Sequence, residues 1–350
     1  MQDQGAGRTC RPATRLRTRA DDATNDQSEL AAVAVSVLVA TMARCAAVVF
    51  AVVLAAGCAT GSAGAGPTPQ STTARGASAS ARSPARITKV LAIVEENHSL
   101  PEMRADMPYL DGLARRYGYA SDYRAIAHPS LPNYLAIVGG STFAVRDDAS
   151  PPAHPVHGAS VFGQALRTGH TARLYAESMP TRCATAPAST YAVKHAPWAY
   201  FVDERAACRT GMVPSGTPER GALQRDLRAG RLPTVGMLIP NLDHDAHDGS
   251  LATADGWLRG WLPRLLHGPD FRSGRLAIVV TADEDDGSNA NRVLTVVLAP
   301  GLAHRVVTTP LTHYSLTRFY DDVAQTRPLR AAAGATSLGT AFGLRVATGH

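Results

Sequence analysis

Two apolar segments that end in carboxylates constrain the fold of this chain most strongly. Val90–Ser99 (VLAIVEENHS) runs from five apolar residues into Glu95 and Glu96, and Arg275–Asp286 (RLAIVVTADEDD) repeats the design. Continuous apolar runs of this length are typical of strands buried on both faces of a parallel sheet. Ligands of such sheets bind beyond the carboxyl ends of the strands. The two segments therefore predict an α/β fold with an acidic site at one sheet edge.

Glu96, Asp283 and Glu284 would meet at that edge. Like charges repel each other and resist desolvation, so their convergence implies a bound metal or a basic partner, and we favour a metal. Oxygen ligands without cysteine favour Mg²⁺, Ca²⁺ or Mn²⁺, while nearby histidines leave Zn²⁺ or iron open. A third apolar segment, Thr234–Pro240, also leads into a polar cluster, which contains Asn241, Asp243, His244, Asp245, His247 and Asp248.

The segment Ser121–Tyr134 (SDYRAIAHPSLPNY) is a second candidate for chemistry. Ser130 is followed by Leu131-Pro132 and an apolar run, which is a helix-start pattern. As an N-cap, the serine would stabilise the helix by about 1 kcal/mol. As a nucleophile, it would lie where free N–H groups and the helix dipole favour a phosphate. The pattern alone leaves both interpretations open, and His128 is either a ligand contact or a loop histidine.

The first 85 residues differ in composition from the rest. Residues 1–30 are polar and rich in arginine, residues 31–57 are almost wholly apolar, and residues 59–84 are mainly Gly, Ala, Ser, Thr and Pro. This order predicts a leader over residues 1–58, a flexible linker over 59–85 and a folded domain over 86–345. Because Met42 begins a short signal peptide of its own, we expect translation to start there.

The cysteines agree with export. The sequence LAAGC resembles a bacterial lipobox, in which Cys58 would become the lipidated first residue of the mature protein. Ordinary signal cleavage and an uncleaved membrane anchor are the alternatives. Cys183 and Cys208 are the only cysteines of the predicted domain, and in an oxidising compartment they predict one disulfide. We therefore expect a cell-envelope lipoprotein or a secreted protein.

The charge distribution excludes one class of partner. The net charge is +6, and residues 1–85, with eight arginines and five acids, account for +3 of it. The remainder contains no stripe of basic residues with interleaved aromatics, so a nucleic-acid surface is not indicated.

Six sequence blocks, in the same order, resemble the bacterial phosphoesterase family, which joins acid phosphatases and phospholipase C enzymes. They are ENHS at 96–99, HPSLPNY at 128–134, YAVKH at 191–195, PNLDHDAHDG at 240–249, the acidic run 283–287 and THYSLTRF at 312–319. The resemblance covers roughly residues 88–325. It implies an alkaline-phosphatase-like fold, a three-layer α/β/α sandwich with a mostly parallel central sheet.

The resemblance also implies roles for single residues. Ser130 falls on the family's nucleophile, and the metal ligands fall on Glu96, Asn97, Asp283 and Glu284. The positions expected to contact substrate are His128, His244, Asp245, His247 and His313. The family commonly has Asn-His after the acidic run, whereas this chain has Asn291-Arg292. Arg292 would either replace that histidine as a cation or accompany a changed substrate preference.

These roles imply an exported, metal-dependent phosphoesterase. The first expectation is an acid phosphatase that hydrolyses phosphomonoesters through a phosphoserine, with His247 or His313 protonating the leaving alkoxide. If several histidines must be protonated to bind phosphate, the optimum would be acidic. The alternatives are a phospholipase C-type phosphodiesterase that acts on phospholipids, and a non-catalytic surface lipoprotein that binds a metal or a phosphorylated ligand.

Overall fold

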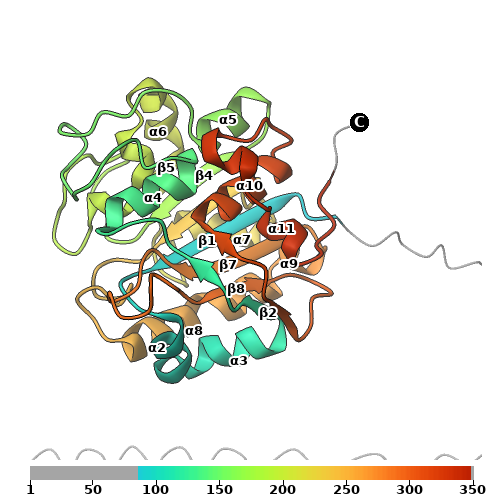
Figure 1. The fold of residues 1–350 in the computed structure, drawn as a ribbon. Helices are drawn as coiled ribbons and strands as arrows, with labels where there is room; N and C mark the ends of the chain where they lie inside the picture. The colour runs from blue at the N-terminus through green and yellow to red at the C-terminus, as the bar shows by residue number, and fades with distance from the viewer. Residues whose placement is uncertain (1–85, 348–350) are drawn as a thin grey trace, which may run out of the picture. The chain divides into compact units, whose positions relative to one another are not determined.

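The computed structural model describes residues 86–347, which are built around an eight-stranded sheet (Figure 1). The strand order is β5-β4-β6-β1-β7-β8-β2-β9. Only β8 is antiparallel to its two neighbours, and the other pairings are parallel. The strands are β1 (Lys89–Glu95), β2 (Gly118–Ala120), β4 (Ala172–Ala176), β5 (Met212–Pro214), β6 (Val235–Ile239), β7 (Leu276–Ala282), β8 (Thr295–Leu298) and β9 (Arg305–Val307).

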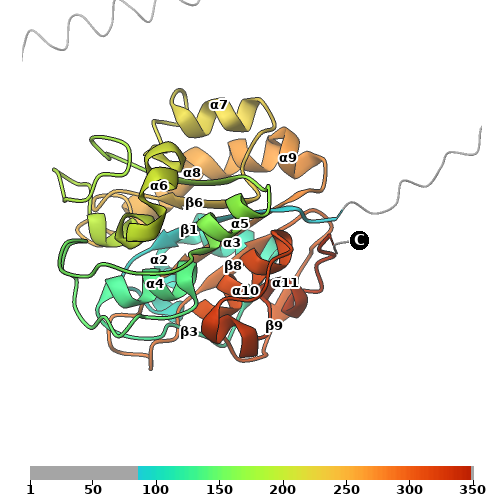
Figure 2. The ribbon, with the colours of Figure 1, turned by 90° about the horizontal axis from the view of Figure 1, so that it is seen from above.

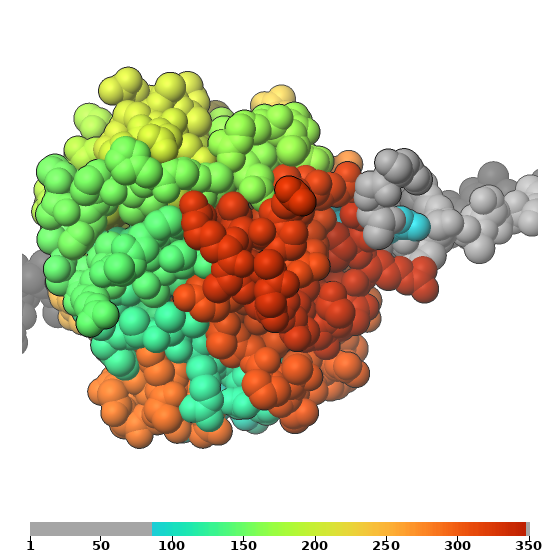
Figure 3. Space-filling model, turned by 45° about the horizontal axis from the view of Figure 1, so that its top comes forward, coloured from blue at the N-terminus to red at the C-terminus, as the bar shows by residue number. Residues whose placement is uncertain are grey.

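Helices cover both faces of this sheet (Figure 2). One layer contains α4 (Ser130–Gly139), α5 (Val161–Arg167), α10 (His313–Val323) and α11 (Leu338–Ala341). The other contains α2 (Leu100–Asp106), α3 (Pro108–Arg116), α7 (Ala222–Arg228), α8 (Leu251–His267) and α9 (Pro269–Arg272). Figure 3 shows the C-terminal helices, in red, in contact with the green segments around α4 and α5. The predicted three-layer α/β/α sandwich is confirmed.

Shorter elements complete the described residues. α6 (Arg205–Gly211) packs beside β4 and β5, and β3 (Tyr123–Arg124) pairs with β10 (Leu311–Thr312) in a separate small sheet. The 3₁₀ turns are η1 (Val193–His195), η2 (Pro197–Tyr200), η3 (Val202–Glu204) and η4 (Arg330–Gly334). No helix among residues 86–347 has the length and apolarity needed to cross a bilayer.

The centre of the sheet explains why the apolar segments are so uniform. In β1, Val90–Val94 are buried, and every residue of β7 is buried as well. Both strands lie inside the sheet with a neighbouring strand on each side, and helices cover both faces of the sheet, so neither face needs polar residues. The predictions for β1, β6 and β7 are confirmed.

The start of α4 decides one interpretation that the sequence left open. Pro129 is the N-cap of α4, its side chain makes no capping hydrogen bond, and Ser130 is the first helical residue. Ser130 therefore does not act as an N-cap. The helix ends at Gly140, whose φ of 65° and close approach to the Leu329 carbonyl leave no room for a Cβ.

The predictions for the N-terminal region concern residues outside those that the structure describes. They concern the leader over 1–58, the start at Met42, lipidation at Cys58 and the linker over 59–85. The predicted disulfide lies inside them: Cys183 and Cys208 are bonded, with their Cα atoms 5.5 Å apart. That prediction is confirmed.

Candidate active site

The ends of β1, β6 and β7 bring their polar clusters together at one sheet edge. β1 pairs with β7 in a register that sets Glu95 beside Ala282, so Glu96 and Asp283 follow side by side. The Asp283 N–H donates to the Glu95 carbonyl at 2.9 Å, and the Glu96 N–H donates to the Asp245 carbonyl at 2.7 Å. The predicted convergence of these strand ends is therefore confirmed.

Ser130 points at this cluster from the first turn of α4. Its Oγ donates a hydrogen bond of 2.9 Å to Glu96 Oε2, and the Tyr134 hydroxyl donates to Glu96 Oε1. All three side chains are buried. Burial would raise the pKa of Glu96, but His195 and the Tyr134 hydrogen bond outweigh it and lower the pKa. Glu96 is thus an ionised acceptor that orients the serine hydroxyl.

The helix start is less open than the sequence suggested. The Leu131 N–H donates to Asp148 Oδ1 at 2.9 Å, so this backbone donor already has a carboxylate partner. The Leu131 N–H group is therefore not free to bind a phosphate, because the Asp148 carboxylate already accepts its hydrogen bond.

Asp283 and Glu284 form the acidic half of the site. Asp283 Oδ1 accepts the backbone N–H groups of Asn97 and Glu284, at 3.2 Å and 2.7 Å. Asn97 reaches it with a φ of 53°, a conformation that asparagine tolerates better than most residues. Burial, with the charges of Glu96 and Glu284, raises the pKa of Asp283 well above its usual value. Burial and Glu96 likewise raise the pKa of Glu284 to about 8.

A basic wall, formed by Lys194 and His195, faces these carboxylates. Neither residue was predicted from the sequence to belong to the site. His195 Nε2 lies 3.2 Å from Glu96 Oε1, and its Nδ1 lies 3.1 Å from Asp245 Oδ2. Burial would lower the pKa of His195, but these two carboxylates outweigh it and raise the pKa to about 9. Lys194 Nζ lies 2.9 Å from Asp148 Oδ2 and 3.2 Å from His247 Nε2. The YAVKH block contained the signal for this pair.

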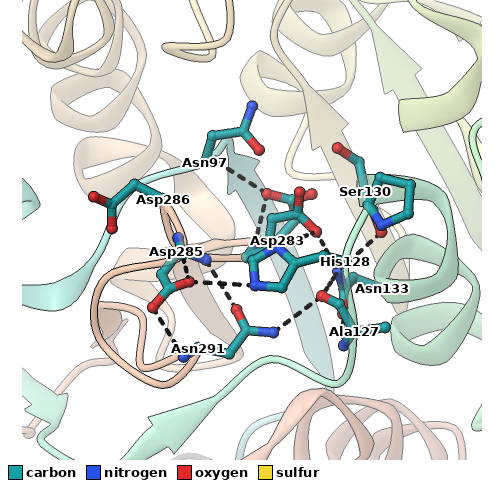
Figure 4. Close-up of polar contacts among 12 residues, drawn as sticks. Asn97, Ala127, His128, Ser130, Asn133, Asp283, Asp285, Asp286 and Asn291 are labelled. Carbon is teal, nitrogen blue, oxygen red and sulfur yellow. Dashed lines mark hydrogen bonds and ion pairs between the residues drawn. The ribbon is translucent and has the colours of Figure 1, made fainter.

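His128 lies at the mouth of the site between two carboxylates (Figure 4). Its Nδ1 is 3.3 Å from Glu284 Oε2, and its Nε2 is 3.3 Å from Asp285 Oδ1. Both atoms of the Asn133 amide hold the preceding loop, because Oδ1 accepts the N–H groups of residues 126 and 127 while Nδ2 donates to the Ala127 carbonyl. Asn291 Nδ2 donates to the same carbonyl at 3.0 Å.

The open mouth beside His128 has a volume of about 410 Å³. It is lined by Asn97, His128, Glu284, Asp285, Asp286 and Gly287. Five of these six residues have polar or charged side chains, and none has an aliphatic side chain.

Two predicted substrate contacts, His313 and His244, do not line the mouth beside His128. His313 is fully buried, with Nε2 at 2.6 Å from the Asp283 carbonyl and Nδ1 at 3.2 Å from the Tyr123 hydroxyl. Burial lowers the pKa of His313 to about 4. The ring therefore positions the Asp283 backbone instead of facing a ligand. His244 pairs with Glu177 at 3.0 Å and stacks on Trp257.

Asp245 and His247 take different positions near the cluster. Asp245 is buried and holds His195, and its Oδ1 accepts the His247 N–H at 2.9 Å. The His247 ring is 28% exposed and pairs with Asp248 at 2.7 Å.

Arg292 stands where the family commonly has a histidine. It donates to Asn289 Oδ1 at 3.2 Å, while its buried Nε has no hydrogen-bond partner among the described residues.

Two sets of donors at this edge fit a metal ion. The first is the predicted set around Asp283, whose buried Oδ2 accepts no hydrogen bond from the described residues. The second is Glu96, His195 and His247, whose ligand atoms lie within 4.8 Å of one another. Lys194, beside His247, would repel a cation bound to the second set. In the first set, the pKa values of Asp283 and Glu284 are raised, so a bound cation would stabilise their ionised forms. The electrostatics favour the first set, whereas the geometry favours the second, whose ligand atoms already converge.

Comparison with known proteins agrees with the sequence blocks. The sequence model of the Phosphoesterase family matches residues 102–323. The chain belongs to the Phosphoesterase family. As a member it is a phosphoric ester hydrolase, and the resemblance inferred from the six blocks is confirmed.

Named relatives of this phosphoesterase are phosphatases. The phosphatidylinositol-3-phosphatase of Mycobacterium tuberculosis (strain ATCC 25618 / H37Rv) is 32% identical over 233 residues, which is 65% of this chain and 73% of that protein. The phosphate-repressible acid phosphatase of Penicillium chrysogenum is 28% identical over 220 residues, 59% of this chain and 52% of that protein. The chain thus spans about half the length of this fungal relative.

A solved structure shows the same fold. It is a protein of the alkaline phosphatase superfamily from Vibrio parahaemolyticus, with a TM-score of 0.51 and 8% identity, covering 72% of this chain and 70% of that chain. At this identity the likeness concerns the fold of the phosphoesterase domain alone.

Proposed function

We propose that this phosphoesterase is an exported, metal-dependent acid phosphatase that hydrolyses phosphomonoesters through a phosphoserine at Ser130. One observation carries the proposal: the Ser130 hydroxyl donates to the buried Glu96 carboxylate between an acidic cluster and a basic wall. A hydroxyl needs activation to act as a nucleophile, and a phosphoryl group needs positive charge around it.

The acidic cluster is the part of the site that would hold a metal. Glu96, Asn97, Asp283 and Glu284 are the residues we assign to it, since Glu96, Asp283 and Glu284 are buried and Asp283 Oδ1 accepts the backbone N–H groups of Asn97 and Glu284. A bound divalent ion would activate the serine oxygen and offset the charge of the phosphoryl oxygens. The oxygen-rich set favours Mg²⁺, Ca²⁺ or Mn²⁺ and leaves Zn²⁺ or iron open.

The residues of the chain perform the transfer in two steps. Ser130 Oγ attacks phosphorus, so that a serine O–P bond forms while the bond from phosphorus to the leaving oxygen breaks. The serine proton is balanced by the proton that the leaving alkoxide takes up. Water then attacks the phosphoserine, releasing phosphate and restoring the hydroxyl. Lys194, which lies beside Asp148 and His247, would offer its positive charge to the phosphoryl oxygens, while the buried His195 would hold Glu96 in place.

Only one of the two histidines expected to protonate the leaving group remains suitable. His313 has both ring nitrogens engaged and a low pKa, so it would be neutral under most conditions. His247 is partly exposed beside Lys194, and we assign proton donation to this ring.

A second candidate is a phosphoinositide monophosphatase, because the mycobacterial relative is named for that activity. It would use the same Ser130 chemistry on a lipid headgroup. A phospholipase C-type diesterase is favoured less, since the mouth of the site has a polar lining. Family membership leaves the non-catalytic lipoprotein without support.

The proposal is tested by comparing three substrates over pH 4–9: p-nitrophenyl phosphate, bis-p-nitrophenyl phosphate and a short-chain phosphatidylinositol 3-phosphate. We expect monoester hydrolysis that is lost with a chelator and with Ser130→Ala. A preference for the diester would replace the acid phosphatase by a phosphodiesterase. Turnover that survives Ser130→Ala would refute the phosphoserine.

Export is the remaining part of the proposal. The Cys183–Cys208 disulfide supports it, since stable disulfides form mainly in oxidising compartments. The apolar leader and LAAGC support a membrane tether at Cys58 or secretion. Fractionation of cells, followed by detection of the protein in the envelope or medium, tests this part independently.

A further inference from the structure

The sheet edge opposite the active site collects arginines from distant parts of the chain. Parallel strands β1, β6 and β7 begin at this edge, and helices of the outer layer end there. Figure 1 shows the start of β1 and the C-terminal residues on the same side of the sheet. We call six exposed residues the arginine edge: Arg116, Arg228, Arg231, Arg272, Arg305 and Arg345.

Hydrogen bonds to backbone carbonyls join the segments that carry these residues. The Ile87 N–H donates to the Arg345 carbonyl at 2.7 Å, and the His304 N–H donates to the Arg116 carbonyl at 3.2 Å. Lys89, in β1, reaches the Gly230 carbonyl next to Arg231 at 3.4 Å. The six residues therefore line one continuous edge, although they are far apart in sequence.

The charge of the arginine edge is uncompensated. None of the six forms an ion pair with a carboxylate of residues 86–347, which is also true of exposed arginines elsewhere, such as Arg146 and Arg220, so what distinguishes this edge is that six such residues share it. Two acids at this edge are already paired, Asp270 with Lys89 and Arg275, and Asp226 with Arg173. Helix dipoles account for arginines that end helices, but Arg231, Arg305 and Arg345 lie outside helices.

A groove on this edge adds an apolar component. Arg305 and Arg345 line a space of about 460 Å³, whose other walls include Ile87, Leu302, Phe342 and Leu344. Val306, next to Arg305, is 49% exposed. A basic rim over an apolar floor matches the boundary between lipid headgroups and acyl chains.

We propose that the arginine edge docks on a membrane surface that contains anionic phospholipids. Each basic side chain near such a surface strengthens binding by about five-fold and acts within a Debye length. The chain enters the described domain at Arg86, on this same edge, so the apolar segment of the leader is joined to the docking side. This continuity favours a membrane over a nucleic acid as the partner.

Docking by this edge directs the active site away from the bound membrane. β1 leads from the arginine edge to Glu96 through seven residues, or about 23 Å of extended strand. A protein docked in this way would reach soluble phosphoesters, or lipids of another membrane, more readily than lipids of the membrane beneath it. This consequence rests on the proposed function, whereas the docking itself does not.

The experiment compares three full-length proteins: wild type, the edge variant Arg231→Gln/Arg305→Gln/Arg345→Gln, and the control variant Arg146→Gln/Arg220→Gln/Arg259→Gln. Both variants remove three exposed positive charges and keep the leader. Co-sedimentation with vesicles of phosphatidylcholine and 30% phosphatidylglycerol is measured at about 0.05 M and 0.5 M salt, with pure phosphatidylcholine as reference. p-Nitrophenyl phosphate hydrolysis and thermal melting verify that each variant is folded.

We expect the edge variant to bind anionic vesicles at least about ten-fold more weakly than wild type at low salt, and the control variant to stay within about two-fold. High salt should remove the difference, and hydrolysis should be unchanged. Equal binding of all three proteins, or equal loss in both variants, would overturn the proposal. Edge-dependent binding to duplex DNA without binding to vesicles would also overturn it. If the wild-type protein does not hydrolyse p-nitrophenyl phosphate, the proposed function is refuted, while the result for membrane docking still stands.

Discussion

Ser130 Oγ and Glu96 Oε2 lie 2.9 Å apart, although they belong to α4 and to the end of β1. Tyr134, one turn further along α4, donates to the other oxygen of the same carboxylate. Glu96 therefore ties the first turn of the helix to the central strand. A rigid carboxylate in this position sets the direction of the serine hydroxyl before any substrate binds.

Ser130→Ala should lower kcat by at least about a thousand-fold, because the attacking oxygen is removed. The matched control is Ser250→Ala, which removes the hydroxyl that caps α8 by accepting from Thr253 N. This control should cost about 1 kcal/mol of stability and no activity. Steady-state kinetics and urea unfolding separate the two effects. Equal kcat values for the two variants would contradict the assignment of Ser130.

Asp283→Asn should weaken the binding of a divalent ion and abolish chelator-sensitive turnover, because it removes a buried charge from the proposed ligand set. Calorimetric titration of the chelated protein with Mg²⁺, Mn²⁺ and Zn²⁺ measures the affinity directly. Asp286→Asn is the control, since it changes an exposed acid in the same loop. Unchanged affinity in Asp283→Asn would point to Glu96, His195 and His247 as the metal ligands instead.

Lys194→Met should lower kcat/KM by about a hundred-fold or more if Lys194 has the proposed role, because it removes the positive charge that would face the phosphoryl group. Lys89 is the other lysine of the chain, and it pairs with Asp270 at the opposite edge. Lys89→Met should lower the melting temperature and leave kcat/KM nearly unchanged. If both variants lose only stability, Lys194 has a structural role.

Removing the disulfide with Cys183→Ser/Cys208→Ser should lower the free energy of unfolding by about 3 kcal/mol, since the bond closes a loop of 25 residues. That loop carries Lys194 and His195, so activity should be lost at a lower temperature than in wild type. Thermal melts with parallel activity assays test both statements. An unchanged melting temperature would show that packing alone holds the loop.

Asp321 should make the domain more stable in mild acid than at neutral pH. Burial outweighs its hydrogen bonds and raises its pKa to about 7, although Leu329 N and Gln164 Nε2 donate to it. Between the unfolded pKa near 4 and this value, the folded state holds a proton that the unfolded state lacks. Its contribution to stability is therefore full below about pH 4 and is lost as pH rises toward 7.

Asp321→Asn tests this linkage, because an amide does not titrate in this range. Urea midpoints at pH 4.5, 6 and 7.5 should fall less steeply with rising pH in the variant than in wild type. Asp322→Asn is the control, since it changes a neighbouring, partly exposed acid. Parallel slopes in wild type and Asp321→Asn would argue against a raised pKa.

The sequence was sufficient to predict the fold and the acidic part of the site, which contains Glu96, Asp283 and Glu284. Uninterrupted apolar runs predicted β1, β6 and β7, because only strands covered on both faces tolerate such runs. Since parallel strands deliver their carboxyl ends to one edge, Glu96, Asp283 and Glu284 could be placed together. The two cysteines of the domain left a single possible pairing within it.

Tertiary structure alone decided which polar residues complete the site. Lys194 and His195 lie in a 3₁₀ turn without periodicity, and a fold of the intervening chain brings them to Glu96. His313 looked equivalent to the other histidines, yet packing of α10 buries it behind Asp283. The arginine edge is likewise invisible as a stripe, because its residues come from the ends of separate elements. Local sequence determines periodicity and burial, whereas contacts between distant segments depend on how the layers pack.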